Sequence, residues 1–181
     1  MQRSQVRKRG LYVGRFQPFH KGHLEAVKWI LTQVAEAVIV VGSAQYSHTP
    51  ENPFEAGERL TMIRKALDEV GIPRERCEVL PVPDIHTHGV WVEHIVSYVP
   101  RFDVVFANDS LTKRLFHEDG RFPVKPIPFY DREKFNATEI RKRIVQGGGW
   151  VELLPRTVVD YILEIDGVQR IQDLAKSDKV P

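Results

Sequence analysis

Residues 11–23 read LYVGRFQPFHKGH, and this stretch decides the fold of the 181-residue chain. Its apolar start, Leu11 to Val13, predicts the end of a short buried strand, and Gly14 frees the backbone for a sharp exit. Pro18 prevents a helix from starting earlier, whereas from Gly22 onward apolar residues recur with helical spacing. The chain is therefore expected to pass from a strand through a tight loop directly into a helix.

Two histidines, His20 and His23, fall in the first turn of this predicted helix. Unpaired backbone N–H groups point outward there, so anions bind at such ends. The two rings can face the same bound group, and Arg15 adds a positive charge, so we predict a phosphate site. Surface histidines or a pair of zinc ligands are the plainer interpretations. Zinc is disfavoured because no third ligand follows at a usual spacing and the only thiol, Cys77, lies in a separate strand-like segment.

Strand and helix patterns alternate along the rest of the chain. Apolar runs predict strands over 37–41, 77–82, 103–107 and 124–129, and helical patterns cover 57–70, 89–99, 137–146 and the region from 155 onward. This alternation is typical of βαβ units with right-handed crossovers. We therefore predict an α/β fold, a Rossmann-like doubly wound parallel sheet with helices on both faces, followed by C-terminal helices.

Polar clusters mark one edge of the predicted sheet. They lie over 14–23, 43–48, 84–88 and 108–109, each directly after a predicted strand. Ligands of parallel sheets bind beyond the carboxyl ends of the strands. We expect the functional site at this edge.

Composition narrows the function classes. The formal net charge is +2, and because basic side chains crowd the first ten residues, the remainder is slightly acidic. A dedicated nucleic-acid binder needs a broad basic surface, so no nucleic-acid partner is expected. We interpret residues 1–9 as a basic tail and 10–181 as a single domain. The single Cys77, and the lack of a secretory leader or an apolar spanning stretch in the sequence, favour the cytoplasm without membrane attachment.

A second polar constellation covers 135–141, Phe-Asn-Ala-Thr-Glu-Ile-Arg. Asn136 and Thr138 lie at a helix start, with Arg141 one turn further on the same side. Helix capping alone would explain Asn136 and Thr138, whereas a second phosphate site would also use Arg141. These residues by themselves leave both interpretations open.

Residues 14–23 resemble the HxGH signature of the nucleotidyltransferase superfamily, and Thr138 with Arg141 match its second motif, Ser-x-Thr-x-x-Arg, where Asn136 replaces the serine. The chain is most similar to the archaeal nicotinamide-nucleotide adenylyltransferases, from Arg9 to about Lys176. Further matching strings are Gly42-Ser43-Ala44-Gln45, Ser47-His48-Thr49, Asn52-Pro53-Phe54, Ala56-Gly57-Glu58-Arg59, Pro83-Asp84-Ile85 with Trp91, and Asp131-Arg132. His88 departs from the pattern, because the family usually carries Asn there.

The resemblance implies that the chain joins the phosphate of nicotinamide mononucleotide (NMN) to the AMP part of ATP, giving NAD and pyrophosphate by direct in-line attack. It implies catalytic roles for His23 at the α-phosphate, for His20 and Arg15 at the triphosphate, and for Arg141. The implied ATP and phosphate contacts are Gly14, Arg15, Phe16, Gly22, Arg132, Thr138 and Arg141.

For the second substrate the resemblance implies Asp84 and Trp91. An indole face suits a cationic pyridinium ring, and Asp84 can accept a hydrogen bond from the carboxamide. Mg²⁺ is implied as the cofactor, held mainly by the ATP phosphates, and a homo-oligomer, suggested to be a hexamer, as the assembly.

Two rival hypotheses remain at this level. A sister adenylyl- or cytidylyltransferase with another phosphorylated acceptor would share both phosphate motifs but would not need Asp84 and Trp91. A non-catalytic nucleotide sensor would keep the pocket but would not need His20, His23 and Arg141. The sequence leaves undecided the preference between the amidated and the deaminated mononucleotide.

Overall fold

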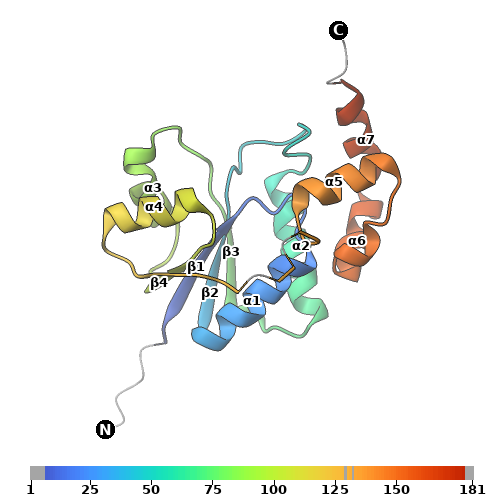
Figure 1. Cartoon of the computed structure of the whole chain (residues 1–181). Coiled ribbons are helices and arrows are strands. Elements are labelled where there is room, and N and C mark those ends of the chain that lie inside the picture. Colours follow the sequence, from blue (N-terminus) through green and yellow to red (C-terminus); the bar gives the residue numbers. More distant parts are fainter. Residues whose placement is uncertain (1–6, 129, 132, 178–181) are drawn as a thin grey trace.

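The computed structural model describes residues 7–128, 130–131 and 133–177 and has a central parallel sheet (Figure 1). Its strands follow the order β3-β2-β1-β4-β5, all parallel. They are β1 (Arg9–Gly14), β2 (Glu36–Val41), β3 (Cys77–Pro81), β4 (Val104–Phe106) and β5 (Val124–Lys125). Because the chain winds outward from β1 in both directions, the sheet is doubly wound, as predicted, with a switch point between β1 and β4.

Seven α-helices accompany the sheet in the described part of the chain. They are α1 (Lys21–Gln33), α2 (Ala56–Glu69), α3 (Trp91–Tyr98), α4 (Ser110–Asp119), α5 (Ala137–Gln146), α6 (Arg156–Glu164) and α7 (Gly167–Ser177). Figure 1 shows α3 and α4 on one side of the sheet, and α1, α2 and the C-terminal helices on the other. The predicted helices on both faces, and the C-terminal helices, are confirmed. Among the described residues no helix is long and apolar enough to cross a membrane.

Strand β2 explains why both faces are covered. Its successive side chains alternate between two hydrophobic clusters: Ile39 and Val41 pack with α1 and α2, whereas Val38 and Val40 pack with α3. All four are essentially inaccessible to solvent. Each such burial contributes on the order of 1.5–3 kcal/mol, so the β-branched run is stable only between two layers of helices.

The C-terminal helices stabilise the segment that leads into α2. Arg170 of α7 forms a bidentate ion pair with Glu58, with N–O distances of 2.6 and 2.9 Å, and also donates to the Pro53 carbonyl. Glu69 at the end of α2 accepts from the Thr157 backbone and hydroxyl at the start of α6. These contacts hold the loop before α2, and both ends of α2 itself, against the C-terminal helices.

Three elements differ from the sequence-based expectation. Helix α4 was not predicted, although Asp109 caps it by accepting from the Thr112 N–H at 2.7 Å. Strand β5 is shorter than the predicted 124–129. Strand β1 begins at Arg9, the last residue of the predicted tail, whose side chain pairs with Glu36 at 2.6 Å.

Candidate active site

Two cavities meet at the carboxyl end of β1, at the switch point of the sheet. The larger has a volume of about 690 Å³ and lies toward α3 and α4, and the smaller, about 230 Å³, lies toward α1 and the segment after β5. Both are lined by Val13, Gly14 and Asp109. A pair of ligands bound in the two cavities would therefore touch at this point.

The histidine pair closes the start of α1. His20 is the N-cap residue, and the His23 backbone N–H donates to His20 Nδ1 at 3.2 Å. The reverse bond, from the His20 backbone N–H to His23 Nδ1, is 3.3 Å long, so the two side chains form a reciprocal capping box. Their rings stack with centroids 3.5 Å apart. Both histidines line the smaller cavity.

This capping fixes the protonation of both rings. A nitrogen that accepts a hydrogen bond carries no proton, so each neutral imidazole holds its proton on Nε2. Burial lowers the pKa of His20 to about 3. Burial, and then the neighbouring His20, also hold the pKa of His23 well below its usual range. The pair therefore offers two neutral Nε2–H donors at neutral pH.

The glycines of the loop are required by close packing of aromatic rings. A Cβ at Gly14 would lie 2.6 Å from the ring of Phe16, which is buried and has a φ of 53°. A Cβ at Gly22 would lie 2.7 Å from Cβ of Phe135, whose ring stacks on His20. Phe16 is thus a packing residue under the loop, and it also contacts the His23 ring edge-on.

Three arginines gather at this edge of the sheet. Arg15 is exposed and lines the larger cavity. Burial first, and the positive charge of Arg15 second, lower the pKa of Arg59, to about 10, and that of Arg141. Such a concentration of guanidinium groups attracts polyanions.

Arg59 holds the ends of two strands together. Its side chain is fully buried and donates to the carbonyl groups of Arg15 at 2.9 Å, Gly42 at 2.8 Å and Ser43 at 3.1 Å. The guanidinium at this sheet edge therefore serves backbone carbonyls.

The second motif reaches the loop through Arg141. Its guanidinium donates to the Gln17 carbonyl at 2.9 Å and to the Thr138 hydroxyl at 3.3 Å. Asn136 caps α5 by accepting from the Thr138 N–H at 2.9 Å, which supports the capping interpretation for Asn136. In the described chain, Thr138 and Arg141 are not part of the lining of either cavity. Arg132 lies outside the described residues.

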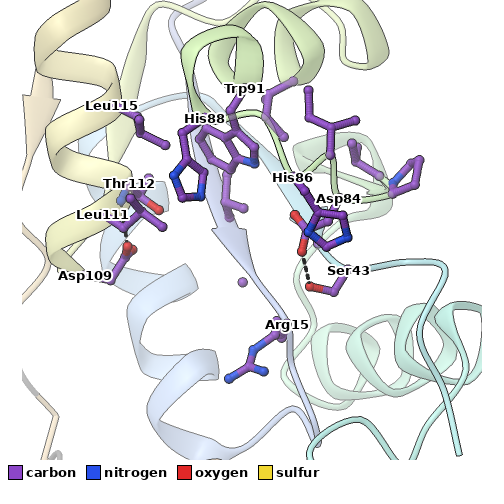
Figure 2. A pocket seen from close by; sticks show the side chains of 17 residues that line it. Arg15, Ser43, Asp84, His86, His88, Trp91, Asp109, Leu111, Thr112 and Leu115 are labelled. Atoms are coloured by element: carbon purple, nitrogen blue, oxygen red, sulfur yellow. Dashed lines mark hydrogen bonds between the residues drawn. The ribbon is translucent and has the colours of Figure 1, made fainter.

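Asp84 and Trp91 both line the larger cavity. Figure 2 shows Trp91 on the α3 side, Asp84 joined to Ser43, and Arg15 below them. The Ser43 hydroxyl donates to Asp84 Oδ2 at 2.5 Å. Trp91 is half-buried and packs edge-on against Phe116, with centroids 5.9 Å apart. Trp91 thus contacts the core on one side and the cavity on the other.

Two further histidines lie at the mouth of the larger cavity. His88 stands beside Trp91 in Figure 2, and His86 contacts the hydroxyl of Tyr46 at 2.9 Å. Both histidines are exposed. His88, which departs from the family pattern, thus lines the larger cavity.

Sequence reasoning missed several residues that build the site. Gln17 holds the backbone of Phe54 with both ends of its side-chain amide, at 2.9 and 3.0 Å. Asp109, which belongs to a polar cluster at a strand end, lines both cavities without having been assigned a role. Ser43 lies within a quoted string, but only the fold shows that its partner is Asp84.

The family comparison agrees with this geometry. The chain matches the cytidylyltransferase-like family over residues 11–143, and this match and the site together define a nucleotidyltransferase. A Saccharolobus solfataricus protein named nicotinamide-nucleotide adenylyltransferase is 48% identical over 171 residues, covering 94% of this chain and 99% of the relative. A Thermococcus kodakarensis protein of the same name is 48% identical, covering 93% of this chain and 89% of the relative. The chain belongs to the nicotinamide-nucleotide adenylyltransferase family.

A solved structure supports the fold. It is a bifunctional NMN adenylyltransferase/ADP ribose pyrophosphatase from Francisella tularensis, complexed with AMP and a Mn ion, with a TM-score of 0.79 and 23% identity. The match covers 96% of this chain and 53% of that longer chain. At this identity the likeness shows the shared fold alone.

Proposed function

We propose that this chain transfers AMP from ATP to NMN, forming NAD and pyrophosphate. The observation that carries the proposal is the meeting of two cavities at Gly14, directly beside the histidine pair. A reaction that joins two nucleotides through their phosphates needs two binding sites that share one end. The larger cavity has the size typical of small-ligand sites.

We assign NMN to the larger cavity and the adenine nucleotide to the side of the smaller cavity. Trp91 offers its indole to a cationic pyridinium ring, an attraction of about 0.5–2 kcal/mol. Asp84 offers a carboxylate oxygen to the carboxamide N–H₂. Within the smaller cavity, the Nε2–H groups of His20 and His23 suit phosphate oxygens.

The chemistry follows from bringing two anions together. An oxygen of the NMN phosphate attacks the α-phosphorus of ATP, the bond from that phosphorus to the bridging oxygen breaks, and pyrophosphate leaves with the electron pair. The NMN phosphate is already ionised and needs no general base. The protein therefore contributes mainly position and charge neutralisation, which supply most of the acceleration in such transfers.

Each assigned residue has a distinct task in this scheme. His23 donates to the α-phosphate, while His20 and Arg15 neutralise the triphosphate and the leaving group. Thr138 and Arg141 bind the β- and γ-phosphates. The bond from Arg141 to the Gln17 carbonyl supports this assignment, because it holds the guanidinium against the phosphate loop.

We further propose that Mg²⁺ accompanies ATP. In the described residues no group of three or more His, Cys, Asp or Glu side chains could hold a metal ion, which suits an ion carried by phosphates and water. The ion would neutralise phosphate charge when bound. A contact of Arg132 with the nucleotide, a homo-oligomeric assembly and a cytoplasmic location also remain proposals.

Product analysis tests the function. The protein is incubated with ATP, Mg²⁺ and one acceptor at a time, namely NMN, phosphopantetheine or a phosphorylated alcohol, and products are identified by mass. We expect NAD from NMN and no comparable product from the others. A product from another acceptor would identify a sister transferase, and nucleotide binding without any product would identify a sensor.

A further inference from the structure

Asp84 is held in one orientation by the loop that follows β2. The Gln45 side chain donates to the Asp84 carbonyl at 2.9 Å and accepts from the Asp84 N–H at 2.8 Å. The Ser43 hydroxyl donates to Oδ2 of the same residue at 2.5 Å. Three hydrogen bonds from two neighbouring side chains therefore fix both the backbone and the carboxylate of Asp84.

The two supports are themselves anchored. Ser43 is only 7% exposed, and its carbonyl accepts from the buried guanidinium of Arg59. On the other side of Asp84, the His94 ring donates to the Pro83 carbonyl at 2.7 Å. Rotation of the Asp84 carboxylate would break the bond from Ser43, so the remaining oxygen, Oδ1, keeps a fixed position in the larger cavity.

A carboxylate in a fixed position distinguishes two kinds of ring substituent. Carboxylate oxygens only accept hydrogen bonds, so Oδ1 can pair with the N–H₂ of a carboxamide. A ring carboxylate would bring a second acceptor and a second negative charge to the same point. We propose that Ser43 and Gln45 are positioning residues that make Asp84 select the carboxamide over the carboxylate of the mononucleotide.

The inference rests on the proposed function, because it takes NMN as the ligand of this cavity. Three cationic or titratable groups line the same cavity and could favour an anion, namely Arg15, His86 and His88. All three are exposed, so water and salt screen their charges. Asp84 is half-buried and rigidly held. Its preference for the carboxamide therefore outweighs the attraction of these exposed groups for a ring carboxylate.

The test compares kcat/KM for NMN with that for nicotinic acid mononucleotide, with ATP saturating. We expect wild type to prefer the amide by about 10- to 100-fold, the range for a hydrogen bond to a charged group. Asp84→Asn should lower this ratio by about tenfold or more, since an asparagine can donate to a carboxylate. Ser43→Ala and Gln45→Met should lower it in the same direction and leave the KM for ATP unchanged.

Matched controls come from exposed positions outside the cavity. Ser97→Ala removes a hydroxyl that bonds only within α3, and Asp160→Asn neutralises a carboxylate on α6. Both should keep the wild-type ratio. A merely structural role for Ser43 would lower both rates together and leave the ratio unchanged.

Three results would overturn the inference. The first is a wild-type ratio near one, and the second is an unchanged ratio in folded Ser43→Ala and Asp84→Asn proteins. The third is a ratio that responds to His88→Asn but not to Asp84→Asn.

Should wild type form no dinucleotide, the proposed function fails, and calorimetric titration of the two mononucleotides then decides the inference by their relative affinity. If a variant does not fold, the same titration is carried out on wild type, which must bind the amide mononucleotide more tightly than the acid.

Discussion

Replacing His20 by asparagine should make the protein less sensitive to acid. The His20 ring caps α1 through an unprotonated Nδ1, and its partner His23 returns the same bond. Protonation of either ring turns an acceptor into a donor and breaks the capping box. Asparagine is a good N-cap residue that supplies a side-chain oxygen in the same role and does not titrate.

The size of the effect follows from the lowered pKa of His20, about 3 in the folded protein against an ordinary value of 6.5. Between these values the unfolded chain binds a proton that the folded chain does not, so stability falls as the pH drops. From pH 7 to pH 5 this one histidine costs about 2 kcal/mol. His23→Asn should act in the same direction, because its pKa is also lowered by burial.

Urea unfolding of wild type and His20→Asn at pH 7 and pH 5 measures the difference. The variant loses some packing at both pH values, but its free energy of unfolding should fall by about 2 kcal/mol less than that of wild type over this interval. An equal loss in both proteins would mean that His20 takes up a proton in the folded protein as readily as in the unfolded chain, and the assignment of its Nδ1 as an unprotonated cap would then be wrong.

Further substitutions separate the roles of the other site residues. His23→Ala should lower turnover by about 10²–10³ with a much smaller change in ATP affinity, and near-normal turnover in the folded variant would remove His23 from the chemistry. Trp91→Ala should weaken NMN binding by about 1–2 kcal/mol and leave ATP binding intact by calorimetry, whereas equal losses would indicate a collapsed core. Arg141→Lys should damage turnover, measured as pyrophosphate release, because lysine keeps the charge but loses the planar fork, and an unaffected rate would exclude a bidentate phosphate contact. Arg59→Met should destabilise the fold by about 3–5 kcal/mol in urea, since it leaves carbonyl groups at the ends of β1 and β2 unpaired, and a change below about 1 kcal/mol would contradict that clamp.

The fold was predictable where the sequence signal is local. The strand, loop and helix over β1 and α1 are specified by Gly14, Pro18 and the apolar spacing from Gly22 onward. Strand β2 is a continuous β-branched run, as expected for a strand buried on both faces. These elements agree with the prediction because each depends on neighbours within one turn or one strand.

Helix α4 shows where this reasoning failed. Its sequence, SLTKRLFHED, has few apolar positions, and among them Leu111 is largely exposed. The signals were weak but present, with Asp109 as the N-cap and Gly120 in the left-handed region at the end. Burial of Phe116 against α3 and the sheet stabilises the helix, and this tertiary contact cannot be read from the segment itself.

In the site, too, local features could be predicted from the sequence, whereas contacts between distant segments could not. The sequence indicates that His20 and His23 share a helix start and that Asp84 follows a strand. It does not indicate that Ser43 binds Asp84, because that contact joins loops 41 residues apart and requires β2 and β3 to be neighbours in register. The role of Arg59 depends in the same way on the meeting of two strand ends.

Pyrophosphate release from ATP, measured with and without NMN, tests the central claim most directly. Direct transfer between two adjoining cavities predicts release only when both nucleotides are present, with one NAD formed for each pyrophosphate. Release of one pyrophosphate per protein molecule from ATP alone would reveal a covalent adenylyl intermediate and contradict direct attack. Failure to release pyrophosphate from ATP and NMN together, with correctly folded protein and Mg²⁺ present, would contradict the transferase function itself.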